Sequence, residues 1–255
     1  MNWMKKVAVA LVCLLPLGLQ AAKIDTLQVK SPSMNKSIEV VVVSPDVAAT
    51  EACPVIYLLH GYGGNARTWV GIKPDLPKIA DEKGVFFVCP DGKNTWYWDS
   101  PLNADVRYET FISDELVKYV DSHYKTVADR KGRAITGLSM GGHGAMWNGL
   151  RHSDVFSAAG STSGGVDIRP FPKNWEMSVQ IGEKAKYPEN WEKYTVINLV
   201  PTLRKDQIAL IFDCGDSDFF LEVNKNYHEA LLKQGIDHDF ITRCLLYTSP
   251  SPRDA

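Results

Sequence analysis

The sequence predicts an α/β fold with a mostly parallel central sheet and helices on both faces. Short apolar runs that suit buried strands alternate with stretches of helical periodicity after residue 50. Residues 85–88 form an uninterrupted apolar run, which is typical of a parallel strand buried on both faces. Between residues 109 and 124, Ile112, Leu116, Val120 and His123 recur at helical spacing, so we expect a helix with one core-facing stripe.

The expected elements follow one another along the chain. Two early strands at 24–29 and 37–43 flank a turn at 32–35, and strands also follow at 55–59, 85–88, 133–136, 208–212 and 240–243. Helices are expected at 109–124, from residue 140 onward and at 219–233. Residues 164–198 have weak periodicity, which is typical of an insertion between core strands. Aromatic residues in such an irregular segment more often pack it against the core than bind a ligand.

Residues 1–21 have the composition of a secretory signal. Lys5 and Lys6 precede the apolar stretch 7–19 and a small-residue ending, so we expect cleavage after Ala21 and a secreted or periplasmic protein. An uncleaved membrane anchor is the alternative. Since no other segment is long and apolar enough to span a bilayer, the mature form is expected not to bind a membrane.

Residues 22–243 are enough for one sizeable domain and too few for two ordinary ones. The formal net charge of -2 leaves no basic excess for nucleic acid. Cys53, Cys89 and Cys214 are an odd number without C-x-x-C or metal-ligand spacing, so no metal is expected, and they allow one disulfide whose pairing the sequence does not fix.

The most informative motif is Gly137-Leu138-Ser139-Met140-Gly141. It is a G-x-S-x-G between an apolar strand and a small-residue helix, which is where a nucleophilic serine lies on a sharp turn. The glycines are needed because side chains there would collide with the neighbouring strand and helix. Since glycine and serine are common, the motif is a weak signal alone and needs catalytic partners.

Two partner motifs are present. His60-Gly61-Tyr62-Gly63-Gly64 ends a buried strand, and such a turn supplies a backbone N–H for an oxyanion hole; a plain glycine turn is the alternative. The loop at 213–218 carries Asp213, Asp216 and Asp218 after another strand, and an acid there would orient a histidine. Aspartates that only form a turn and cap a helix are the alternative.

With these motifs in family order, the chain resembles the esterase D family of α/β-hydrolases. That family includes S-formylglutathione hydrolases, feruloyl and acetyl esterases and, more distantly, the antigen 85 mycolyltransferases. The matching segments include 31–35, 57–64, 90–97, 108–111, the G-x-S-x-G and 213–219, and the resemblance covers about residues 24 to 243. It implies an α/β-hydrolase fold.

The resemblance also implies site residues. Ser139 would be the nucleophile, the N–H groups of Tyr62 and Met140 the oxyanion hole, and Asp218 the triad acid, with Asp216 the less favoured acid. Four residues are candidates for substrate binding: His60, Gly61, Asn94 and Trp96. The segment 94–98 follows a strand end on the catalytic side, where stacking on a sugar or phenolic ring would suit it.

The family's catalytic histidine is missing. It lies in a Gly-His-aromatic motif soon after a strand like 240–243, but here the pattern breaks at Cys244, and residues 244–255 resemble translated sequencing-adapter sequence. We therefore expect residues 244–255 to be a non-native tail and the fold to lack its last elements. In the uncorrupted protein, the catalytic histidine would lie beyond Arg243. A serine without a base is a poor nucleophile, so this chain is expected to be inactive. His228 and His238 are the weaker substitutes.

The sequence therefore predicts a secreted serine carboxylesterase. It would hydrolyse short acyl or phenolic esters, of acetyl or feruloyl type, on a small molecule or on plant cell-wall carbohydrate, and it would use no cofactor. One alternative is an acyltransferase to a sugar or alcohol. A second is an inactive carbohydrate-binding protein. The natural ester and the oligomeric state do not follow from the residues.

Overall fold

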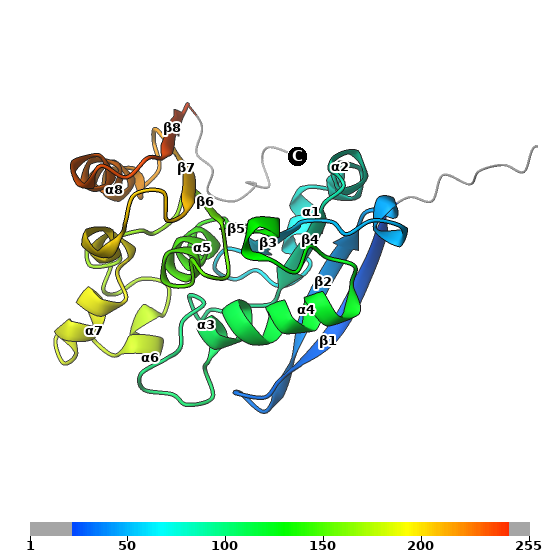
Figure 1. Cartoon of the computed structure of the whole chain (residues 1–255). Helices are drawn as coiled ribbons and strands as arrows, with labels where there is room; N and C mark the ends of the chain where they lie inside the picture. The colour runs from blue at the N-terminus through cyan, green and yellow to red at the C-terminus, as the bar shows by residue number, and fades with distance from the viewer. Residues whose placement is uncertain (1–21, 245–255) are drawn as a thin grey trace, which may run out of the picture.

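The computed structural model describes residues 22–244, which build one eight-stranded sheet (Figure 1). The signal predicted at 1–21 and the tail at 245–255 lie outside the described residues. The strands are β1 (Lys23–Ser31), β2 (Lys36–Ser44), β3 (Val55–Leu59), β4 (Phe86–Pro90), β5 (Arg133–Gly137), β6 (Ala158–Thr162), β7 (Ala209–Gly215) and β8 (Asp239–Arg243). Their order in the sheet is β1-β2-β4-β3-β5-β6-β7-β8.

The sheet is mostly parallel, which confirms the predicted fold class. β1 pairs antiparallel with β2 and β2 antiparallel with β4, while every pairing among β3 to β8 is parallel. The β1–β2 hairpin and the α8–β8 unit lie at opposite ends of the sheet (Figure 1). Because the parallel strands share a direction, their carboxyl ends meet at one edge, where ligands bind in such sheets.

Helices cover both faces. On one face, α2 (Leu76–Lys83) and α1 (Thr68–Ile72) pack on an apolar cluster with β2, β3 and β4. On the other face, α4 (Leu116–His123), α5 (Met140–Arg151) and α8 (Leu221–Gln234) contribute to the main core. The remaining helical elements are α3 (Tyr108–Thr110), α6 (Met177–Ile181), α7 (Pro188–Lys193), the 3₁₀ turns Asp46–Ala49, Arg130–Gly132 and Val196–Thr202, and the π turn Phe111–Glu115.

Two elements differ from the sequence prediction. The helix expected over 109–124 is interrupted by a π turn between α3 and α4. Three residues of its predicted core-facing stripe are buried, namely Ile112, Leu116 and Val120, whereas His123 is exposed. Strand β6 was not predicted, because its residues Ala158–Thr162 are small and lack the apolar run of the other strands.

The segment predicted as an insertion at 164–198 lies between β6 and β7 and contains α6 and α7. Trp191 is fully buried there, and its indole N–H donates to the Gly182 carbonyl at 2.9 Å. Of the helices between Ala22 and Cys244, none combines the length and the apolar character needed to cross a membrane.

Candidate active site

Ser139 lies on a strained turn between β5 and α5. Its φ of 57° and ψ of -115° place it in a region that residues with a side chain rarely adopt. The turn requires glycine on both sides of Ser139, because a larger residue at either position would collide with neighbouring backbone. A Cβ on Gly141 would lie 2.2 Å from the Leu59 carbonyl oxygen, and one on Gly137 would lie 2.3 Å from the Gly141 oxygen. The predicted geometry around Ser139 is therefore present, and Ser139 is partly exposed.

The glycine-rich turn after β3 contacts this serine turn. A Cβ on Gly61 would lie 3.6 Å from the Ser139 Cβ and 3.3 Å from the Leu138 carbonyl oxygen. Within the described residues, the Tyr62 N–H has no hydrogen-bond acceptor. Met140 is the first residue of α5, and N–H groups in a first turn have no acceptor within their helix. Both amides predicted for the oxyanion hole therefore belong to turns that meet at Ser139.

His60 lies beneath the oxyanion turn with 1% of its surface exposed. Its Nδ1 is 2.7 Å from the Gly61 carbonyl oxygen, and its Nε2 accepts the Gly92 N–H at 2.9 Å. Both ring nitrogens are therefore occupied, which leaves His60 without a free atom for substrate and assigns it to support of the turn. Because the Gly61 carbonyl and the Tyr62 N–H share one planar peptide unit, a contact to the carbonyl also fixes the amide.

Asp218 offers a buried acceptor without a donor. Its exposed fraction is 6%, and one carboxylate oxygen, Oδ1, accepts the Phe220 N–H at 2.8 Å. The other, Oδ2, has no partner among the residues that the structure describes. By contrast, Asp216 is exposed, and Asp213 is paired with Arg243 at 3.1 Å. The geometry thus agrees with the preference for Asp218 over Asp216 as the acid, whose role stays a prediction.

Strand ends connect Asp218 to the serine turn. The Ser139 N–H donates to the Thr162 carbonyl at the end of β6, at 2.9 Å. Thr162 is the strand partner of Asp213 on β7, and Asp218 follows five residues later in the loop. The three predicted loops therefore follow β3, β5 and β7 at the same edge of the sheet, with β6 lying between β5 and β7.

His143 is the histidine nearest in sequence to Ser139, and it is fully buried. Its Nε2 accepts the Trp98 indole N–H at 2.8 Å, and its Nδ1 donates to the Gly165 carbonyl at 2.8 Å. Burial lowers the pKa of His143 to about 4, so the ring is neutral at physiological pH. Its hydrogen bonds hold α5 against its neighbours and leave no ring nitrogen free to act as a base.

The other histidines also have partners away from Asp218. Those partners are the carbonyl of Tyr119 for His123, Glu109 for His152, and the two rings of His228 and His238 for each other, at 2.7 Å between nitrogens. All six histidines of the chain lie in the described residues, and no hydrogen bond joins any of them to Asp218 there.

The predicted aromatic platform at 94–98 does not lie on the surface. Trp96 and Trp98 are 1% and 0% exposed and stack on each other, with ring centroids 5.6 Å apart. Stacking of substrate on Trp96 is therefore not supported, because neither face of its ring is open. Asn94 is partly exposed, and its Oδ1 accepts the Gly63 N–H at 2.9 Å, so it supports the oxyanion turn directly.

Exposed aromatic side chains lie beside the acid loop and on the oxyanion turn. Phe219, next to Asp218, is 48% exposed and stacks on Trp175 with centroids 5.2 Å apart. Tyr62 is 37% exposed. The 164–198 segment, which was expected mainly to pack itself down, thus supplies an aromatic side chain beside the acid loop. The sequence shows that Trp175 is aromatic, but it does not show that Phe219 lies beside it, because only the fold brings the two residues together.

The cysteines form no site between Ala22 and Cys244. Cys53, Cys89 and Cys214 are buried free thiols, and burial raises the pKa of Cys214 to about 12, so it is not a thiolate nucleophile at neutral pH. Over the same residues, no three His, Cys, Asp or Glu side chains are grouped to hold a metal ion.

Comparison with known proteins places the chain in a family. Residues 31–235 match the model of the family described as "Esterase: Putative esterase". The chain belongs to this esterase family. An acetyl esterase of Caldicellulosiruptor saccharolyticus is 26% identical over 206 residues, covering 74% of each chain. A xylanase/feruloyl esterase of Xylanibacter ruminicola is 29% identical over 76% of this chain and 26% of its own.

Solved structures agree with the fold of this esterase. A ferulic acid esterase superposes with a TM-score of 0.74 at 28% identity, over 90% of this chain and 93% of its own. An S-formylglutathione hydrolase from Agrobacterium tumefaciens superposes with a TM-score of 0.72 at 23% identity, over 88% and 86% of the two chains. The family and these homologues support a hydrolase of ester bonds with an α/β-hydrolase structure.

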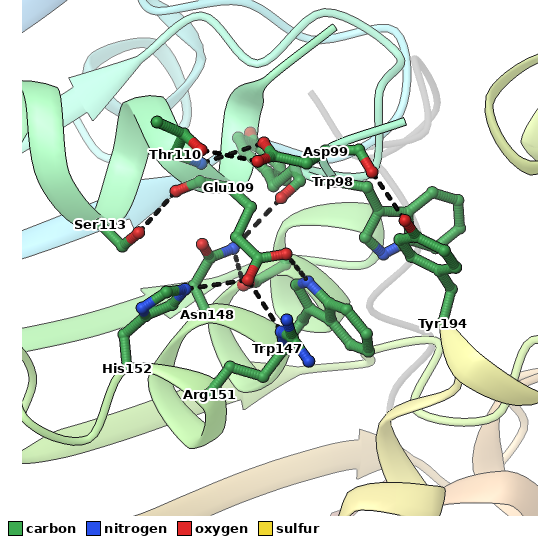
Figure 2. Close-up of polar contacts among 12 residues, drawn as sticks. Trp98, Asp99, Glu109, Thr110, Ser113, Trp147, Asn148, Arg151, His152 and Tyr194 are labelled. Carbon is green, nitrogen blue, oxygen red and sulfur yellow. Dashed lines mark hydrogen bonds and ion pairs between the residues drawn. The ribbon is translucent and has the colours of Figure 1, made fainter. Parts of the chain in front are cut away.

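In this esterase, a buried carboxylate anchors the helix that follows Ser139. Glu109 is 7% exposed and accepts hydrogen bonds from Trp147 at 2.8 Å, Arg151 at 2.8 Å and His152 at 2.9 Å, at the carboxyl end of α5 (Figure 2). Burial alone would raise the pKa of Glu109, but these hydrogen bonds hold that pKa below its usual value. The charged carboxylate therefore stabilises the fold.

We predict that replacing Glu109 changes how stability depends on pH. Because the folded pKa is lowered, the stabilisation from Glu109 is present above about pH 4.3 and is lost as the pH falls through the folded value. The variant Glu109→Gln should lose about 1–3 kcal/mol at pH 7. Urea unfolding at pH 7 and pH 3.5 checks this. The difference between parent and variant should shrink at pH 3.5, and an equal difference at both pH values would contradict the charge argument.

Proposed function

We propose that this protein is a serine carboxylesterase that hydrolyses short acyl or phenolic esters through an acyl-serine intermediate, with plant cell-wall carbohydrate as the carrier of those esters. The observation that carries the proposal is the contact between the strained Ser139 turn and the Gly61 turn, which bears the unpaired Tyr62 amide. A hydroxyl beside free amide donors is the arrangement that acyl transfer requires.

The proposed reaction has two steps. The Ser139 Oγ attacks the ester carbonyl while its proton passes to a base, and the N–H groups of Tyr62 and Met140 hold the negative oxygen that forms. The carbon–oxygen bond to the alcohol then breaks, and the alcohol leaves with the proton. Water attacks the acyl-serine in the same way, releases the acid and restores the hydroxyl. Neither step uses a cofactor.

The base is proposed to be a histidine that follows β8. Arg243, the last residue of β8, pairs with Gly215, and its carbonyl accepts the Asp216 N–H at 2.7 Å. The chain after Arg243 therefore leaves the sheet beside the loop that holds Asp218. An imidazole N–H donated from there would satisfy the unpaired Asp218 Oδ2. Since Cys244 follows Arg243 in this chain, we propose that the chain itself is inactive or slow.

The aromatic pair beside the acid loop supports a phenolic acyl group. Trp175 and Phe219 present stacked rings next to Asp218, and Phe219 is half exposed. A flat ring such as that of a ferulic acid could extend this stack. The relatives named acetyl esterase and feruloyl esterase support both parts of the proposal, a short acyl group such as acetyl and a phenolic one such as feruloyl.

We predict that restoring a histidine restores activity. In a chimera, residues 244–255 are replaced by the segment that follows the corresponding strand of the Caldicellulosiruptor acetyl esterase. The chimera should release p-nitrophenol from the acetate ester at least 10²-fold faster than the parent chain, since general base catalysis contributes about that much. Its Ser139→Ala variant should lose this gain. Equal rates for the parent chain and the chimera would contradict the proposed base.

The two loop acids give a matched pair of variants in that chimera. We predict that Asp218→Asn lowers kcat by about 10²–10⁴-fold, because the imidazole loses its orienting carboxylate. Asp216→Asn should change kcat less than about threefold, because Asp216 is exposed and outside the hydrogen bonds of the site. If the two variants had equal effects, Asp218 would not be the triad acid.

We also propose that the protein is exported. The basic residues and the apolar stretch within 1–21 support this proposal. Expression in a bacterium with its native leader should give an extracytoplasmic product whose amino terminus begins after Ala21. An intact leader on cytoplasmic protein would contradict export.

A further inference from the structure

We infer that Asn94 and Glu176 act as positioning residues that fix the oxyanion turn around Tyr62. The inference rests on the proposed function, because it assigns a task to that turn. It concerns a residue, Glu176, that lies 82 positions from Asn94 in the chain and in none of the sequence motifs. The two side chains form a relay from the segment between β6 and β7 to the backbone beside Tyr62.

The turn needs support from outside because it is rich in glycine. Gly61, Gly63 and Gly64 surround Tyr62, and Gly63 has a φ of 78°. Such residues leave the backbone many alternative conformations. On one side of Tyr62, the Gly61 carbonyl is held by His60 and by the Gly64 N–H at 3.0 Å. The other side depends on Asn94, whose Oδ1 accepts the Gly63 N–H at 2.9 Å.

Glu176 fixes the orientation of the Asn94 amide. The Asn94 Nδ2 donates to the Glu176 Oε2 at 3.4 Å. An amide can be flipped so that nitrogen and oxygen exchange places, and a carboxylate next to the nitrogen favours one of the two orientations. That orientation directs Oδ1 toward the Gly63 N–H. Glu176 thereby determines whether the turn receives an acceptor or a second donor.

Glu176 also faces the Tyr62 side chain. Burial and the neighbouring Glu176 carboxylate raise the pKa of the Tyr62 phenol. The same carboxylate is linked through Asn94 to the backbone that follows Tyr62. This link restrains the backbone after Tyr62, which helps to keep the Tyr62 N–H in one place for the developing oxyanion.

The backbone around Glu176 is strained in a way that suits this task. Trp175 and Glu176 have φ values of 48° and 52°, and Trp96 and Tyr97 have φ values of 59° and 61°. The two strained pairs are joined by the Trp96 indole N–H, which donates to the Trp175 carbonyl at 3.2 Å. Adjacent residues with side chains in this region persist only when surrounding contacts impose the conformation, and they cluster at functional sites.

Exchanging the amide and the carboxylate tests the relay. Asn94→Asp alone puts two carboxylates face to face, while Glu176→Gln alone keeps a weaker neutral contact. The double variant, Asn94→Asp with Glu176→Gln, restores a donor–acceptor pair and keeps an acceptor for the Gly63 N–H. Hydrogen exchange of the amides of residues 61–64 is measured in the chain itself. The control is Glu183→Gln, since Glu183 is exposed in the same segment and pairs only with exposed Lys186 at 3.0 Å.

Asn94→Asp should speed the exchange of the Gly63 amide by about tenfold, and the double variant should return it to within about threefold of the parent. Glu183→Gln should leave it unchanged. In the chimera, kcat per folded enzyme should fall and recover in the same order while KM stays within about twofold. A double variant as fast in exchange as Asn94→Asp would overturn the relay.

Glu176→Ala covers the case in which Asn94→Asp does not fold, because Glu176 is exposed and its removal leaves the core intact. It should speed the Gly63 exchange by about threefold, and no change would also overturn the inference. The exchange data need no ester hydrolysis. If the chimera shows no Ser139-dependent hydrolysis but the exchange pattern holds, the proposed function fails and the relay stands.

Discussion

The strained backbone at Ser139 sets the positions of the loops that surround it. A side chain at a φ of 57° costs about 1–3 kcal/mol, so the surroundings must hold it. Gly141 packs against the carbonyl end of β3 with no space for a Cβ, which fixes the distance between the serine turn and the oxyanion turn. At the far end of α5, Glu109 ties the helix to the preceding helical segment through Trp147, Arg151 and His152.

Much of the fold could be predicted because local pattern and tertiary role agree in most elements. The apolar runs at β3 and β4 are both strand-like and buried, and β5 and β7 bury alternate residues. β6 was not predicted, because its residues are small and their size reflects tertiary packing and not a local strand pattern. A Cβ on Gly149 of α5 would lie only 2.6 Å from the Ala159 Cβ, so the helix approaches β6 too closely for larger side chains. This close approach is not visible in a single sequence.

The site was predictable where its chemistry depends on glycine and serine motifs that act within one turn. Ser139 and the turn at Tyr62 belong to this class. Trp96 was predicted to stack on a substrate ring, but it is buried, and a run of aromatic residues in a sequence does not reveal whether their rings are open to a ligand. Trp175 and Glu176 were missed because only the fold brings their segment against the oxyanion turn and the acid loop.

A crystal structure of the chimera with the restored histidine, after reaction with a fluorophosphonate at Ser139, tests the oxyanion geometry most directly. We expect a phosphonyl oxygen within about 3 Å of the backbone nitrogens of both Tyr62 and Met140, the distance of a charge-assisted hydrogen bond. An adduct whose oxygen lies away from these two amides, or a Ser139 hydroxyl buried against the core and closed to the reagent, would contradict this geometry.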